Sequence, residues 1–156
     1  MQTLAIFVDV QNIYYTCRQA FGRSFNYRYF LKQFSSQYQL VSATAYAIAP
    51  KDDGQTKFQD ALRHMGFEVK TKPYIQRSDG SAKGDWDVGI TIDIMDTAEK
   101  VDNILLLSGD GDFDLLLRRV QQDNCYTQVL SVPELTAKSL LDHCQQHHCI
   151  TKEFLL

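Results

Sequence analysis

The run ILLLSGDGDF, from Ile104 to Phe113, constrains the fold of this chain more than any other stretch. Its first four residues are apolar, as in a strand that is buried on both faces inside a parallel sheet. Two aspartates, Asp110 and Asp112, follow directly and stand among glycines. Because glycine has no Cβ and permits a sharp turn, we expect both carboxylates to lie together at the carboxyl end of this strand. Open α/β sheets bind ligands at that edge.

The beginning of the chain repeats this pattern. The apolar residues 4–8 are followed by Asp9, and Asn12 is placed to cap the helix that we expect to begin at Ile13. If the two strands are neighbours, as in doubly wound sheets, Asp9 meets Asp110 and Asp112. Carboxylates that lie so close repel each other and need a proton or a cation, so the pattern predicts a divalent metal site.

Apolar strand patterns alternate with helical periodicity along the whole chain. Strands are expected near 3–9, 41–49, 68–74, 102–108 and 126–132, and helices near 12–21, 27–38, 55–65, 87–100, 112–123 and 134–146. This alternation predicts an α/β fold with a mainly parallel sheet of about five strands, covered on both faces. A length of 156 residues suits a single domain over 1–156.

Composition and charge restrict where the protein is expected to act, but they do not decide what it binds. The chain has no membrane-length apolar run and no signal peptide, so we expect a cytoplasmic protein without a membrane partner. Its four cysteines are expected to be reduced thiols. A net charge of −3 argues against coating nucleic acid by bulk electrostatics. It does not exclude a nuclease, because an acidic metal site lowers the net charge while a local basic face still holds phosphates.

Two further acids lie in the helix predicted for 87–100. Asp87 fits the N-cap position, from which its carboxylate can turn toward the strand ends. Asp93 stands among apolar neighbours, where a buried acid needs either a metal or an ion pair with a lysine or arginine. The candidate metal ligands are therefore Asp9, Asp87, Asp93, Asp110 and Asp112, with Asn12 and Ser108 as neutral neighbours. Oxygen-only ligands favour Mg²⁺ or Mn²⁺, which can activate water for phosphodiester hydrolysis.

Three motifs in this order resemble the NYN domains of the PIN-like nuclease superfamily, most closely the LabA-like bacterial branch. They are FVDVQN at 7–12, the Lys83-Gly84 pair followed by Asp87 and Asp93, and SGDGDF at 108–113. The resemblance covers nearly the whole chain. It implies a PIN-like three-layer α/β/α sandwich, an acidic Mg²⁺ site and ribonuclease activity on RNA.

The same resemblance implies roles for individual residues. Asp9, Asp87, Asp110 and Asp112 are implied to be the catalytic, metal-binding acids. Asp93 matches a recurrent acid of the family's central helix, and Asn12 is implied to orient a water molecule or a phosphate. The chain departs from the family pattern at Asp85-Trp86, where a single residue is usual.

Basic and aromatic residues are interleaved near the expected site. The basic ones are Lys51, Lys57, Lys70, Lys72, Arg77 and Lys83, and the aromatic ones are Tyr14, Tyr15, Tyr74 and Trp86. Exposed aromatic rings can stack unpaired bases, and Lys83 is the best candidate for a phosphate contact because it flanks the helix that carries Asp87. Ser108 and Asn12 complete the expected substrate-binding set.

The segment 143–149, HCQQHHC, has helical spacing between possible zinc ligands. Structural zinc sites join two such pairs from separate segments, and the chain has no second pair. We therefore expect the solvated end of a helix.

The favoured function is a metal-dependent ribonuclease. A non-catalytic NYN-type module that binds RNA or regulates is the alternative, and a small-molecule phosphohydrolase using the same pocket is a third class. A homodimer is compatible with the sequence.

Overall fold

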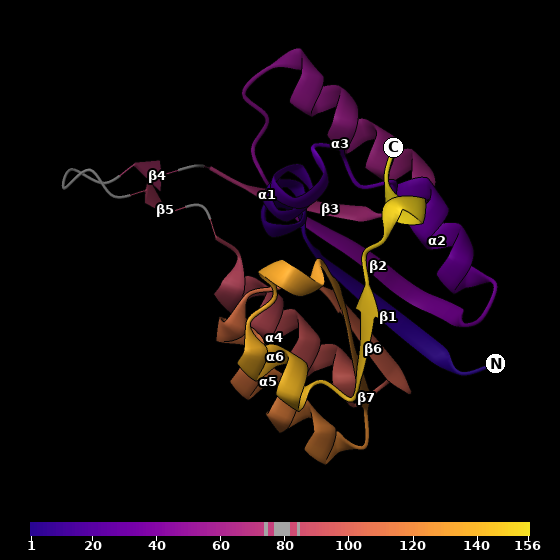
Figure 1. The fold of residues 1–156 in the computed structure, drawn as a ribbon. Coiled ribbons are helices and arrows are strands. Elements are labelled where there is room, and N and C mark those ends of the chain that lie inside the picture. The colour runs from indigo at the N-terminus through magenta and orange to yellow at the C-terminus, as the bar shows by residue number, and fades with distance from the viewer. Residues whose placement is uncertain (74, 77–81, 84) are drawn as a thin grey trace.

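The computed structural model describes residues 1–73, 75–76, 82–83 and 85–156, of which 75–76 and 82–83 are described by their backbone alone. Its centre is a six-stranded sheet in the order β3-β2-β1-β6-β7-β8, in which every neighbouring pair is parallel (Figure 1). The strands are β1 (Thr3–Asp9), β2 (Gln39–Ile48), β3 (Glu68–Lys72), β6 (Asn103–Leu107), β7 (Tyr126–Ser131) and β8 (Gln146–Cys149).

Helices cover both faces of the sheet. They are α1 (Val10–Phe21), α2 (Tyr27–Ser35), α3 (Asp53–Met65), α4 (Asp87–Ala98), α5 (Asp114–Val120) and α6 (Lys138–His143). Side chains of α1, α2 and α3 build one hydrophobic core against the sheet, and those of α4, α5 and α6 build the other (Figure 1). This arrangement confirms the predicted three-layer α/β/α sandwich.

The position of β6 in the sheet explains why its sequence is wholly apolar. Ile104 and Leu106 pack in the core under α4–α6, while Leu105 and Leu107 pack in the core under α1–α3. A strand with a helical layer on each face has no solvent-facing side, so it keeps no polar alternation. The strand order reverses between β1 and β6, and such a switch point is where parallel sheets open a crevice for ligands.

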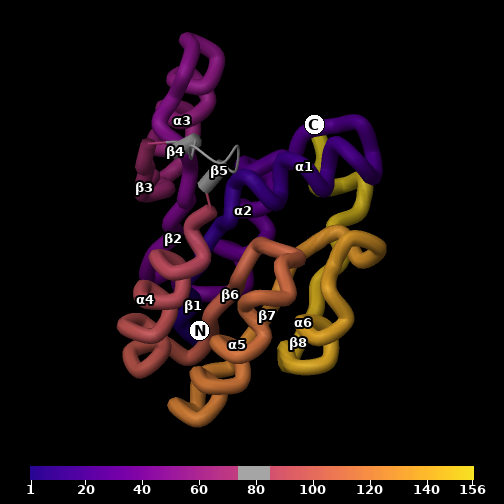
Figure 2. Tube along the Cα trace, turned by 90° about the vertical axis from the view of Figure 1, so that its left-hand side faces the viewer, coloured from indigo at the N-terminus to yellow at the C-terminus, as the bar shows by residue number. Residues whose placement is uncertain are grey.

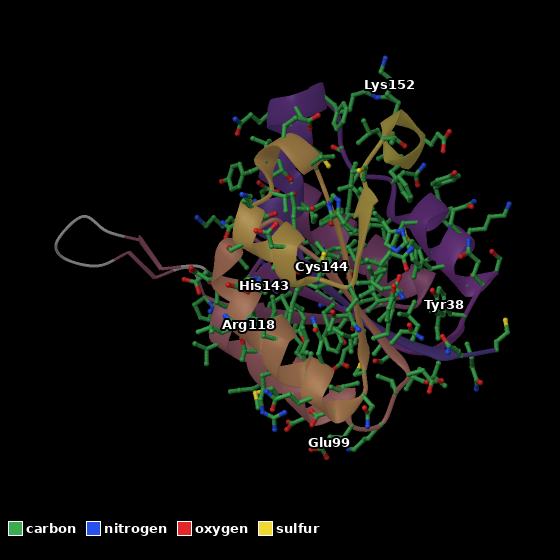
Figure 3. The ribbon with its side chains drawn as sticks, turned by 60° about the horizontal axis from the view of Figure 1, so that its bottom comes forward. Tyr38, Glu99, Arg118, His143, Cys144 and Lys152 are labelled. Atoms are coloured by element: carbon green, nitrogen blue, oxygen red, sulfur yellow. The ribbon has the colours of Figure 1, made fainter. Side chains whose placement is uncertain are left out.

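The sixth strand corrects the prediction of about five strands and of a helical end near 143–149. Helix α6 ends at His143, which Figure 3 labels, and β8 then pairs with the edge of β7. There His147 Nε2 lies 2.8 Å from Ser131 Oγ, and His148 Nε2 lies 2.7 Å from Gln128 Oε1. Pairing with an open sheet edge outweighs the local helical spacing, so residues 146–149 form a strand and not the end of a helix. All four cysteines are free thiols, as expected.

Some short elements lie outside the main sheet. Strands β4 (Ile75–Gln76) and β5 (Ala82–Lys83) pair with each other outside the main sheet (Figure 1). The chain's last residues return to the loop between α1 and α2, where Leu155 forms a β-bridge with Phe25 (Figure 2). In the described part of the chain, no helix is long and apolar enough to cross a membrane.

Candidate metal centre

Three aspartates from separate elements converge at the switch point. Asp9 ends β1, Asp110 follows β6 by three residues, and Asp87 is the first residue of α4. Each offers a carboxylate oxygen, and these oxygens lie within 4.8 Å of one another. The sequence prediction that the ends of the first strand and of the SGDGDF strand meet is thus confirmed by the pairing of β1 with β6.

A hydrogen-bond frame fixes the two strand ends relative to each other. Ser108 Oγ donates to Asp9 Oδ2 at 3.0 Å and accepts from the Asp110 backbone N–H at 3.2 Å. Asn12 Oδ1 accepts from the Gly109 N–H at 2.9 Å. The prediction that Asn12 caps a helix is wrong, because α1 already begins at Val10 and the Asn12 side chain serves the facing loop instead.

The glycines around Asp110 allow close packing. A Cβ on Gly109 would lie 2.8 Å from the Leu135 carbonyl oxygen, and one on Gly111 would lie 2.8 Å from Ala137 Cβ. Among the described glycines, Gly22 and Gly66 have a positive φ, whereas Gly109 and Gly111 do not. The SGDGDF loop needs glycine at both positions because the segment before α6 lies against it.

Burial, together with neighbouring negative charges, raises the pKa of Asp9 and of Asp87. Burial raises the pKa of Asp9 from 3.8 to about 6, and the charges of Asp110 and Asp85 add to this shift, against the hydrogen bond from Ser108. Burial likewise raises the pKa of Asp87 to about 7, with the charges of Asp110, Asp85 and Asp9 next in weight. Carboxylates that resist ionisation together are stabilised in ionised form by a bound cation.

Trp86 anchors the start of α4 and so positions Asp87. Its Nε1–H donates to the Ala47 carbonyl at 2.8 Å, and its ring lies 5.3 Å from that of Tyr46. Lys72 Nζ stands 4.8 Å from the centroid of the Trp86 ring. Trp86 is the N-cap residue of α4, so the prediction of that role for Asp87 is wrong and the Asp87 carboxylate is available to the acid group.

Asp85 is an acid that sequence reasoning left out of the site. Its Oδ1 accepts from the Asp87 N–H at 3.2 Å, and its charge raises the pKa of both Asp9 and Asp87. Its backbone carbonyl accepts a hydrogen bond from Lys72. The sequence signal was the spacing of two residues between Asp85 and Asp87. That spacing alone does not predict that the Asp85 carboxylate lies near the acids at the strand ends.

Two of the expected acids lie outside the group of three. Asp93 pairs with Lys70 at 2.7 Å and accepts from the Tyr46 hydroxyl at 2.7 Å. Burial favours a raised pKa for Asp93, but the hydrogen bonds from Lys70 and Tyr46 outweigh it and lower the pKa. Asp112 is exposed, and its backbone N–H donates to Asp110 Oδ1 at 2.9 Å. Of the alternatives open for Asp93, the structure therefore has the ion pair.

The expected substrate-binding residues fall into separate groups. Ser108 and Asn12 form the frame around the acids. At Lys83 only the backbone of β5 is described, and Tyr74 and Arg77 lie outside the described residues. Lys72 is the basic side chain that contacts the Asp85-Trp86 segment.

Comparison with known proteins identifies the family. The model of the NYN domain matches residues 3–151. The low amplitude and bright protein LabA of Synechococcus elongatus is 32% identical over 145 residues, which cover 88% of this chain and 77% of LabA. The chain therefore belongs to the NYN domain family.

Solved structures confirm the fold. A protein of unknown function from Vibrio parahaemolyticus is 51% identical, with a TM-score of 0.95 over 99% of this chain and 96% of that one. The T5 D15 protein, co-crystallised with metal ions, is 12% identical, with a TM-score of 0.50 over 90% of this chain and 59% of that one. At that identity the likeness concerns the fold alone.

Proposed function

We propose that this protein is a metal-dependent ribonuclease that hydrolyses RNA phosphodiester bonds with Mg²⁺ or Mn²⁺. The observation that carries the proposal is the convergence of three carboxylate oxygens within 4.8 Å at the switch point of the sheet. Family membership supports an RNase-type reading of the same acids. The donor set is oxygen alone, which suits Mg²⁺ or Mn²⁺ better than zinc.

The residues of the site have different proposed roles. Asp9, Asp87 and Asp110 would hold the ion, since their carboxylates are the ones that converge. A bound Mg²⁺ would supply hydroxide from water at neutral pH and stabilise negative charge on the phosphate. Ser108 keeps the Asp9 carboxylate in position through its 3.0 Å hydrogen bond, and Asn12 keeps the Gly109 backbone against α1.

Two expected acids take different roles in this proposal. Asp112 is exposed beside Asp110, where it could bind water of the ion's hydration shell or a second ion. Asp93 has a structural role, because its salt bridge with Lys70 connects α4 to β3. Lys83 on β5 remains the proposed phosphate contact, and Lys72, whose side chain contacts the backbone of Asp85, is added as a second.

The test is cleavage of a labelled panel of RNA and single-stranded DNA in Mg²⁺, Mn²⁺ or EDTA. We expect RNA to be cut in either metal, no cutting in EDTA, and no cutting by Asp110→Asn. Asp142→Asn, an exposed substitution on α6, is the matched control and should cut like the wild type.

A folded wild-type protein that cuts nothing in any metal but still binds RNA would overturn the enzymatic proposal. That result would favour a non-catalytic NYN module.

A further inference from the structure

An aromatic pocket of about 640 Å³ opens beside the metal centre. Its walls come from the start of α1, the residues between α1 and α2, the end of β2 and the first half of α3. Asp9 belongs both to this pocket and to the group of three acids, and Trp86, which anchors Asp87, lines it too. The pocket is therefore continuous with the proposed catalytic site. Its volume falls within the range of about 300–1,000 Å³ that is typical of small-ligand sites.

The aromatic rings of the pocket are accessible. Tyr14, Tyr15 and Phe58 line it and keep exposed fractions of 49%, 59% and 40%. Tyr27 and Tyr46 also line it and are almost fully buried. Exposed rings beside buried ones offer flat apolar surfaces against which a planar ring can stack.

The charges of the pocket disfavour a phosphate inside it, away from the three acids. Among the described lining residues the charged side chains are those of Asp9 and Asp52, and no lysine or arginine is present. Asp52 is engaged as the N-cap of α3, where it accepts from the Gln55 N–H at 2.8 Å. Carboxylates repel phosphate, so the lining fits an uncharged ring system.

We propose that this pocket binds one unpaired nucleobase of the RNA strand whose phosphate lies at Asp9, Asp87 and Asp110. The inference rests on the proposed function and adds the form of the substrate. A base can enter a pocket and stack only after it leaves a duplex, so the site selects single-stranded or locally unpaired RNA. Stacking on aromatic rings tolerates every base, which predicts weak sequence preference.

Binding is tested without cleavage by the fluorescence of an RNA oligomer that contains 2-aminopurine, with Ca²⁺ in place of Mg²⁺. Stacking quenches this base. We expect wild-type protein to quench the single-stranded oligomer and to bind its duplex much more weakly. Tyr14→Ala should weaken single-strand binding by about 5-fold or more, and Tyr14→Trp, which keeps a ring, should retain it. Tyr126→Ala is the matched control, because Tyr126 is 39% exposed at the beginning of β7, away from the carboxyl ends of the strands.

Unchanged affinity in both Tyr14→Ala and Phe58→Ala would overturn the base pocket, as would equal affinity for duplex and single strand. Competition by AMP as strong as that by the oligomer would overturn the RNA strand as the source of the base. If wild-type protein quenches the oligomer as expected but cuts no RNA in Mg²⁺, the nuclease proposal fails and the base pocket stands. If it cuts RNA and the Tyr14→Ala variant binds and cuts equally well, the pocket fails and the nuclease proposal stands.

Discussion

Replacing Asp9 with asparagine should make the metal-free protein more stable at pH 8 than the wild type. The Asp9 carboxyl has a pKa of about 6 in the folded protein against 3.8 when unperturbed. Each unit of pKa shift corresponds to about 1.4 kcal/mol, so keeping Asp9 ionised costs the folded state about 3 kcal/mol at pH 8. For a chain of this size that energy corresponds to a difference of about 6–12 °C in Tm.

The pH dependence has a defined sign. Because the folded pKa is raised, the carboxyl's contribution to stability is fully present below pH 3.8 and is lost as the pH rises through about 6. The Tm of the wild type in EDTA should therefore fall between pH 4 and pH 8 relative to that of Asp9→Asn. Saturating Mg²⁺ should raise the Tm of the wild type at pH 8 and leave that of the variant nearly unchanged.

The assay is thermal unfolding followed by circular dichroism at pH 4, 6 and 8, with EDTA or Mg²⁺. Asp142→Asn, exposed on α6, controls for the loss of a negative charge as such. A Tm gap between Asp9→Asn and wild type that does not widen from pH 4 to pH 8 in EDTA would refute the reasoning.

Three further substitutions test structural contacts around the proposed metal site. Asp93→Asn should lower the free energy of unfolding by about 1–3 kcal/mol through the loss of its Lys70 partner, with Mg²⁺ stabilisation unchanged in the same thermal assay. Gly89→Ala would bring a Cβ to 2.6 Å from the Trp86 ring, so a shift in tryptophan fluorescence and weaker Mg²⁺ stabilisation are expected. Gly109→Ala meets a backbone carbonyl at 2.8 Å and should destabilise by about 1–3 kcal/mol in urea unfolding. If a variant behaves like the wild type in its assay, the contact that it changes does not have the effect proposed for it.

Much of the fold was predictable because the buried strands of a parallel sheet carry an unmistakable apolar signature. The runs that became β1 and β6 were recognisable, and their pairing was expected as a condition, by analogy with doubly wound sheets, for the acids at their ends to meet. Strand β8 was not predictable, because its short polar sequence becomes a strand only through the free edge of β7. Local helical spacing in this segment carried no information about that edge.

The candidate site was predictable in its residue types and less so in its geometry. Asp9, Asp87 and Asp110 were all among the expected ligands, but Asp93 carried the same signal. Its neutralisation by Lys70 depends on the packing of α4 across β3, which the sequence does not encode locally. Tyr14, Tyr15 and Trp86 were expected near the site, but the pocket that they line was not predictable, since its walls come from α1, β2 and α3 together.

The most direct measurement is a crystal structure of the protein grown with Mn²⁺ and its anomalous difference map. Our account predicts a peak within coordination distance of carboxylate oxygens of Asp9, Asp87 and Asp110, and no peak there in Asp110→Asn crystals. Fully occupied Mn²⁺ seated only on other residues, or no ion at the three carboxylates in saturating Mn²⁺, would contradict it.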